Sequence, residues 1–191
     1  GLERGLERFQ GYGDEPPEKN GDYAWLMHIL ASLKGTGKAA VILPHGVLFR
    51  GNAEGTIRRT IVSEKRWIKA IIGLPPNLFY GTGIPACIVV IDKSHADSRE
   101  HVFMIDASRG FVKDGNKNRL RECDIFRIVE TYENELEDDP TYSRKVPISE
   151  IVDKNDCNLN LSRYLQNPNV EDAQDIDGHL RGGIPVRDVD S

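Results

Sequence analysis

Four short apolar runs, each about the length of one β-strand, constrain the fold of this chain more than any other feature. The runs are KAAVIL, WIKAIIGL, PACIVVID and HVFMID, at residues 38–43, 67–74, 85–92 and 101–106. None alternates cleanly between apolar and polar residues, which is typical of strands in a central sheet that is covered on both faces. We therefore expect these four segments to form one sheet.

Three helical segments are expected, before, between and after these runs. Leu26, Ile29, Leu30 and Leu33 have the i, i+3, i+4, i+7 spacing of an amphipathic helix that begins near Asp22. A second helix is expected at residues 53–63, and a third at residues 118–135. Helices that alternate with strands indicate a layered α/β domain.

Composition excludes several classes of protein. The 191 residues include 25 Lys and Arg against 30 Asp and Glu, a net charge of −5, so the chain is a poor candidate for binding nucleic acid by itself. No apolar run approaches the ~20 residues that a membrane span needs. Three cysteines far apart in sequence predict neither a disulfide framework nor a zinc site, and they suggest a reducing cytoplasm.

The chain divides into four parts by pattern. Residues 1–21 are a polar loop rich in Gly and Pro, and residues 22–106 carry the four expected strands. Residues 107–164 add the third helix and a short strand or helix start at 146–152, and residues 165–191 form a polar tail that we expect to be poorly packed. Four strands with two interleaved helices make a small core, so we expect an N-terminal half of the sheet to be absent.

The segment GLPPNLFYGTGIPACIVVID, at residues 73–92, is the sharpest candidate for function. It places Phe79 and Tyr80 on a Gly-rich loop between two buried strands, where binding residues often lie. Either the loop displays the two rings, or Phe79 folds back onto the core. The chain has no phosphate-binding glycine motif and no paired histidines. Arg50, Arg58 and Arg59 could contact phosphate, although we expect them to be solvated.

Several motifs resemble the modification (methyltransferase) subunit of type I restriction-modification systems. They are KAAVILPHGVLFRGNAEGTIRRTIV, IIGLPPNLFYGTGIPACIVVIDK, FMIDAS, KNRL and NDCNLNLSRYL, in the order that this family has them. The resemblance extends from about residue 8 to residue 185. It implies an adenine-N6 DNA methyltransferase that uses S-adenosylmethionine. It also implies the C-terminal half of a Rossmann-like α/β sheet with a mixed α/β and irregular C-terminal extension.

The family's catalytic residues are not in this sequence. The chain lacks the Asn-Pro-Pro-Phe/Tyr motif that holds the target adenine, and it lacks the glycine-rich loop that binds the cofactor. The resemblance therefore implies the C-terminal part of the subunit, with residues 1–21 downstream of the missing motif. We expect no catalytic side chain, no metal ligand and no methyltransferase activity in this chain alone.

The resemblance also implies roles for particular residues. Phe79 matches the aromatic position that stacks on the extruded base, with Tyr80 as the alternative. Pro44 and His45 would border the target pocket. Trp25 would flank the adenine of the cofactor, although a place in the core is an equally good interpretation.

The implied partners are a DNA specificity subunit, a restriction (endonuclease) subunit and double-stranded DNA within their complex. The implied location is cytoplasmic, with no membrane contact. Residues 153–191 are candidates for docking a partner.

Two other classes of function remain open at this point. The chain could be a non-catalytic interaction module of the same half-fold that binds a specificity subunit. Such a module should protect its sheet edge, whereas a fragment should expose apolar surface. An unrelated nucleotide-binding α/β protein is disfavoured because no phosphate loop is present.

Overall fold

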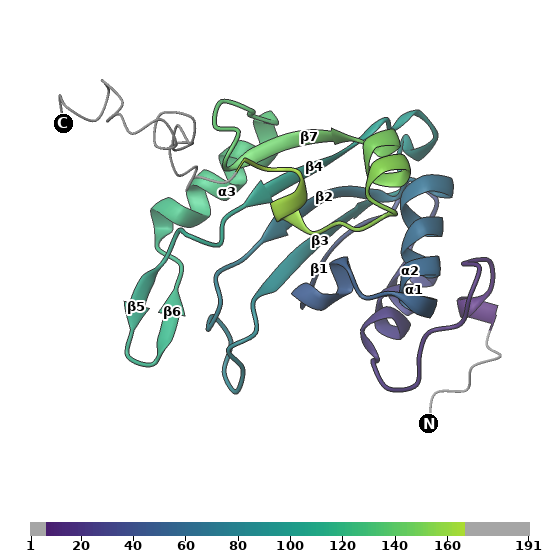
Figure 1. The fold of residues 1–191 in the computed structure, drawn as a ribbon, viewed down its shortest axis with the longest axis horizontal. Helices are drawn as coiled ribbons and strands as arrows, with labels where there is room; N and C mark the ends of the chain where they lie inside the picture. The colour runs from purple at the N-terminus through teal and green to yellow at the C-terminus, as the bar shows by residue number, and fades with distance from the viewer. Residues whose placement is uncertain (1–6, 167–191) are drawn as a thin grey trace, which may run out of the picture.

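A five-stranded mixed sheet with helices on both sides forms the body of the protein (Figure 1). The structure is a computed structural model, and it describes residues 7–166. The strand order in the sheet is β1-β3-β2-β4-β7, and a separate hairpin pairs β5 with β6. The elements are α1 (Asp22–Ser32), β1 (Lys38–Pro44), α2 (Asn52–Arg59), β2 (Ile68–Gly73), β3 (Ala86–Asp92), β4 (His101–Asp106), β5 (Val112–Asp114), β6 (Lys117–Arg119), α3 (Glu122–Asn134) and β7 (Ser143–Pro147).

The four predicted strands are confirmed, and β7 adds a fifth. β3 runs antiparallel to both β1 and β2, β2 runs parallel to β4, and β7 pairs antiparallel with β4. Within residues 7–166, β1 has β3 as its single strand partner and so lies at an edge of the sheet. The segment 146–152, which was open to two interpretations, contains the end of β7 and the start of a π-helical turn at Glu150–Lys154.

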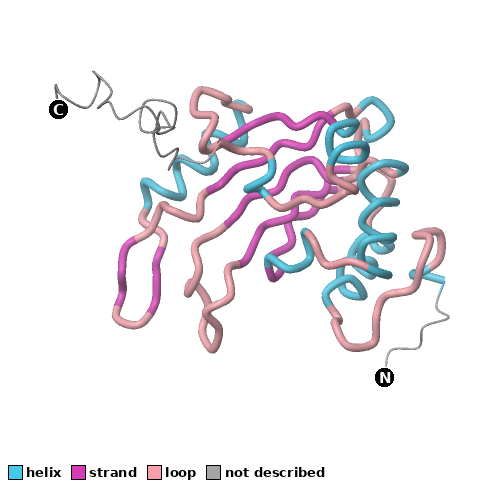
Figure 2. Tube along the Cα trace, in the orientation of Figure 1, coloured by secondary structure: helices cyan, strands magenta, loops and turns pink. Residues whose placement is uncertain are grey.

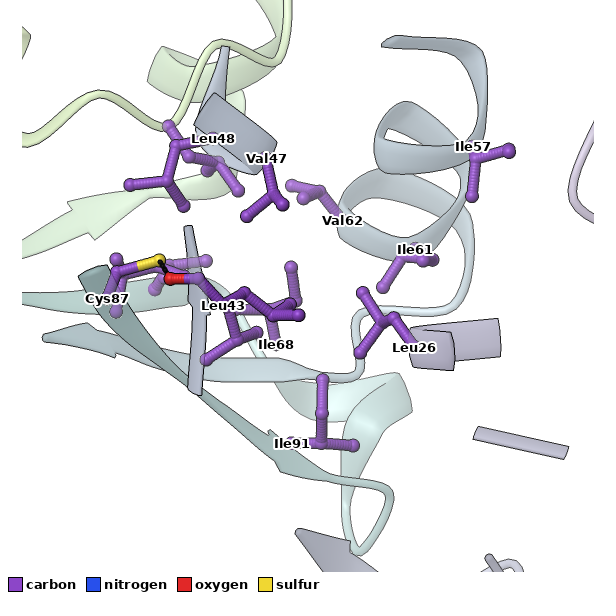
Figure 3. Close-up of a cluster of buried hydrophobic side chains, with 14 of the residues drawn as sticks. Leu26, Leu43, Val47, Leu48, Ile57, Ile61, Val62, Ile68, Cys87 and Ile91 are labelled. Atoms are coloured by element: carbon purple, nitrogen blue, oxygen red, sulfur yellow. Dashed lines mark hydrogen bonds between the residues drawn. The ribbon is translucent and has the colours of Figure 1, made fainter. Parts of the chain in front are cut away.

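One face of the sheet is covered by α1, α2 and the π-helical turn Thr60–Glu64 that continues α2. Leu26 from α1 and Ile57 from α2 pack with Ile91 of β3 in the larger of two buried clusters (Figure 3). The segment 159–165 reaches the same cluster through Leu159 and Leu161. This face is closed, as the apolar runs predicted.

The other face is covered only in part. Ile128 of α3 packs over Phe103 and Ile105 of β4 in the smaller cluster. Toward β1 the covering ends, because Ile42 is 54% exposed and a cavity of about 480 Å³ lies between the sheet and α3. The expectation that both faces are covered is therefore wrong for the β1 side of this face.

The third helix begins later than predicted. Lys117–Arg119 is a strand that pairs with β5, and α3 starts at Glu122. Gly115 has a φ of 59°, which allows the tight turn after Asp114. Figure 2 shows this hairpin extending away from the main sheet. Among residues 7–166, no helix has the length and apolar character to cross a membrane.

Candidate functional site

The loop at residues 74–85 and the turn after β1 meet at one end of the sheet. The antiparallel pairing of β2 and β3 places both ends of this loop at the strand termini, where the Leu74 N–H donates to the Ala86 carbonyl at 2.9 Å. The His45 N–H donates to the Pro85 carbonyl at 3.0 Å, and Pro44 lies in register with Ala86. Segments about 40 residues apart in sequence therefore build one site.

The loop displays two aromatic side chains. Phe79 is 37% exposed and Tyr80 is 93% exposed. Leu78, the residue before them, packs instead against the smaller buried cluster. The alternative in which Phe79 folds back onto the core is therefore wrong, because Leu78 occupies that position.

A cavity of about 440 Å³ lies at the foot of the loop. The lining residues include His45, Leu74, Pro85, Asp106, Ser108 and Asn160. The cavity thus combines apolar residues with several hydrogen-bonding groups, as small-molecule sites do.

Burial of His45 in this cavity favours its neutral form. Burial lowers the pKa of His45 below its ordinary value, and the nearby carboxylate of Asp106 opposes that shift. The His45 ring packs edge-on against Phe49, with 6.1 Å between centroids. Pro44 is exposed and does not line the cavity.

A buried arginine fixes the turn that carries His45. Arg58 is only 3% exposed, and it donates from Nε to the Cys157 carbonyl at 2.7 Å and from Nη1 to the Val47 and Arg50 carbonyls at 3.2 and 2.8 Å. The expectation that Arg58 is solvated is wrong.

The neighbouring arginines are also engaged. The Arg50 guanidinium pairs with Glu54 at 2.6 Å and with Asp22 at 2.5 Å, and Arg59 pairs with Asp156. The four-residue spacing of Arg50 and Glu54 was a sequence signal for this ion pair.

Trp25 does not lie in the core. Its side chain is 66% exposed on α1, and its ring contacts His28 edge-on at 6.3 Å between centroids. The interpretation as a core residue is therefore wrong, whereas the proposed contact with a cofactor stays a prediction. In the part of the chain that the structure describes, no cluster of His, Cys, Asp or Glu could hold a metal ion.

Comparison with known proteins identifies the family. Residues 3–173 match the family described as N-6 DNA Methylase, which is most of the chain. The chain belongs to this family, and its mixed sheet is the methyltransferase fold of the solved type I modification subunits.

Within the family, the similar proteins are methylase subunits of type I restriction enzymes. The MjaVII methylase subunit of Methanocaldococcus jannaschii is 40% identical over 169 residues, which cover 86% of this chain and 28% of that protein. The MpnII methylase subunit of Mycoplasma pneumoniae is 31% identical, over 88% of this chain and 30% of that protein.

A solved structure agrees with these relatives. The type I methyltransferase subunit from Streptococcus thermophilus has a TM-score of 0.78 and 39% identity, over 84% of this chain and 33% of that one. The resemblance to type I modification subunits is confirmed, and the chain spans about a third of the length of the proteins it matches.

Proposed function

We propose that this chain is part of an adenine-N6 DNA methyltransferase of a type I restriction-modification system, and that Phe79 stacks on the adenine extruded from the duplex. The observation that carries the proposal is the partly exposed Phe79 ring on a loop that both neighbouring strands anchor, in a chain of the N-6 DNA methylase family. Tyr80 extends the same aromatic surface.

The physical role of Phe79 is to replace lost base stacking. A base that leaves the duplex loses its stacked neighbours, and an aromatic ring returns ~1–3 kcal/mol per base. His45 supports this assignment as a polar group beside the loop, because its ring can hydrogen-bond a base and burial lowers its pKa. Pro44 lies next to His45 but outside the cavity, so its expected place at the border of the target pocket stays a prediction.

S-adenosylmethionine is the methyl donor that this family implies. The described residues do not offer its glycine-rich loop: Gly81 and Gly83 lie between two strands, so no helix N-terminus follows them. Trp25 is available as an exposed ring for the adenine of the cofactor. We therefore assign the base side of the reaction to this chain and expect the isolated chain to be inactive.

The proposed partners are a DNA specificity subunit, a restriction subunit and double-stranded DNA, in the cytoplasm. The net charge of −5 supports a division of labour in which another subunit reads the DNA sequence. The second candidate is a non-catalytic module of the same half-fold that binds the specificity subunit. The apolar surface left open beside β1 favours the first candidate, because a free-standing module should cover it.

The test compares two phenylalanines in the complete subunit assembled with its specificity subunit. Phe79→Ala should lower methyl transfer to DNA about 5- to 150-fold, which corresponds to losing ~1–3 kcal/mol of stacking. Phe126→Ala removes an equally large exposed ring from α3 and should change little. Phe79→Trp should retain activity. Equal rates for Phe79→Ala and Phe126→Ala would contradict the proposal, and methyl transfer by the isolated chain would contradict its expected inactivity.

A further inference from the structure

The hairpin formed by β5 and β6 contacts the middle of the loop that carries Phe79. The Asn118 N–H donates to the Asn77 carbonyl at 2.9 Å, and Asn118 Nδ2 donates to the Pro76 carbonyl at 2.6 Å. Lys117 Nζ donates to the Phe79 carbonyl and lies 5.6 Å from the centroid of the Tyr80 ring. One short strand thus reaches four residues of the loop, two on each side of Leu78.

Asn118 is a buried residue of the hairpin. It is 4% exposed, and its Oδ1 has no hydrogen-bond partner. Reversing the amide would place Oδ1 against the Pro76 carbonyl, so the orientation is fixed by that acceptor. The bond from Nδ2 to the Pro76 carbonyl is therefore what compensates for burying this side-chain amide.

The rest of the loop has little support of its own. The strands anchor residues 74 and 86, and near the tip the Ile84 N–H donates to Thr82 Oγ1. Asn77 has a φ of 54° and Gly81 a φ of 78°, so the backbone turns sharply on both sides of Phe79. A loop with these turns depends on outside contacts to keep one conformation.

We propose that Asn118 and Lys117 are positioning residues that fix the Phe79–Tyr80 segment, so that the β5–β6 hairpin acts as a support for the base-stacking loop. The inference rests on the proposed function, because it assumes that Phe79 meets the extruded base. Misplacing a reacting group by about 1 Å can cost on the order of a hundredfold in rate, so support at the carbonyls of Pro76, Asn77 and Phe79 matters for catalysis.

The main test uses two lysines of the same hairpin in the complete subunit bound to its specificity subunit. Lys117→Met removes the contacts to Phe79 and Tyr80, whereas Lys113→Met removes the same charge from an exposed position across the hairpin. Lys117→Met should lower kcat about tenfold without changing the KM for S-adenosylmethionine. Lys113→Met should leave kcat unchanged, and Lys117→Arg should restore most of the rate.

A second measurement reports directly whether the hairpin stays bound to the loop that carries Phe79. Hydrogen exchange of the Asn118 amide reports its bond to Asn77, and it should be about tenfold faster in Lys117→Met than in Lys113→Met. Asn118→Ala should produce a larger loss of kcat than Lys117→Met. If Asn118→Ala does not fold, the lysine pair still decides the question.

The outcomes separate this inference from the proposed function. Equal kcat and equal exchange in Lys117→Met and Lys113→Met would overturn the inference. Faster exchange with unchanged kcat would also overturn it, because the hairpin would then hold the loop without affecting the reaction. If Phe79→Ala lowers methyl transfer while Lys117→Met does not, only the positioning role fails. If Phe79→Ala changes nothing, the proposed function itself fails.

Discussion

Replacing Arg58 should destabilise the protein far more than replacing its neighbour Arg59. Arg58 is buried and makes three charge-assisted hydrogen bonds to backbone carbonyls of residues 47, 50 and 157. Each bond of this kind contributes ~1.5–3 kcal/mol, and the cost of burying the guanidinium offsets several kcal/mol of that sum. For Arg58→Met we therefore expect a loss of about 3–5 kcal/mol in the free energy of unfolding.

The comparison with Arg59 makes the prediction specific. Arg59 is the next residue on α2, and it is exposed and paired with an exposed Asp156. Arg59→Met should cost less than ~1 kcal/mol, as exposed ion pairs do. Arg58→Lys should fall between the two, because one ammonium cannot reach three carbonyls as the guanidinium does.

Urea denaturation of the three variants measures the difference. With a slope of ~2–3 kcal/mol per molar urea, Arg58→Met should lower the midpoint by about 1–2.5 M relative to the parent protein. A midpoint within the range of Arg59→Met would refute the reasoning, since it would mean that the three buried bonds contribute no more than a surface pair.

Three further predictions concern the site and its surroundings. A Cβ at Gly73 would lie 2.5 Å from Leu161 Cδ1, so Gly73→Ala should destabilise by ~1–3 kcal/mol. Adding Leu161→Ala should then cost less than it does alone, and additive costs in a denaturation cycle would contradict this contact. Burial lowers the pKa of His45 below 6.5, so the unfolded chain takes up this proton first and stability falls as the pH drops below 6.5. Acid titrations of His45→Gln should show a shallower fall there, and an unchanged slope would contradict the assignment. Burial also raises the pKa of the Cys87 thiol to about 12, so iodoacetamide should label exposed Cys123 and leave Cys87 intact in mass spectra.

Four of the five strands of the main sheet could be predicted because their apolar runs are long enough to identify without neighbours, whereas β7 has no such run. The β5–β6 hairpin could not, since its sequence is charged and has no apolar face to bury. The Asp114-Gly115 pair was the available turn signal, but the apolar residues that follow extended the predicted helix backward to residue 118, over most of β6. The apolar pattern therefore predicted a helix at residues 118–119, where the turn at Asp114-Gly115 forms a hairpin instead.

The candidate site was predictable in outline and not in detail. The loop that carries Phe79 was predicted, but its exposure was left open, because which of Leu78 and Phe79 enters the core depends on the packing of α3 and β4. Arg58 was misjudged because its partners lie on segments up to about 100 residues away. A buried arginine is defined by those carbonyls, which a single sequence does not reveal.

The pairing of β1 with β3, rather than with the nearer β2, has a consequence for synthesis of the chain. Lys38 meets Asp92, so the ribosome must add ~50 residues before β1 has a partner, which takes on the order of several seconds. During that interval the uncharged apolar stretch 39–43 is exposed, and such stretches associate with other chains. The stretch is flanked by Lys38 and Pro44. A charged residue and a proline both oppose association of strands, so they limit aggregation until β3 has been synthesised.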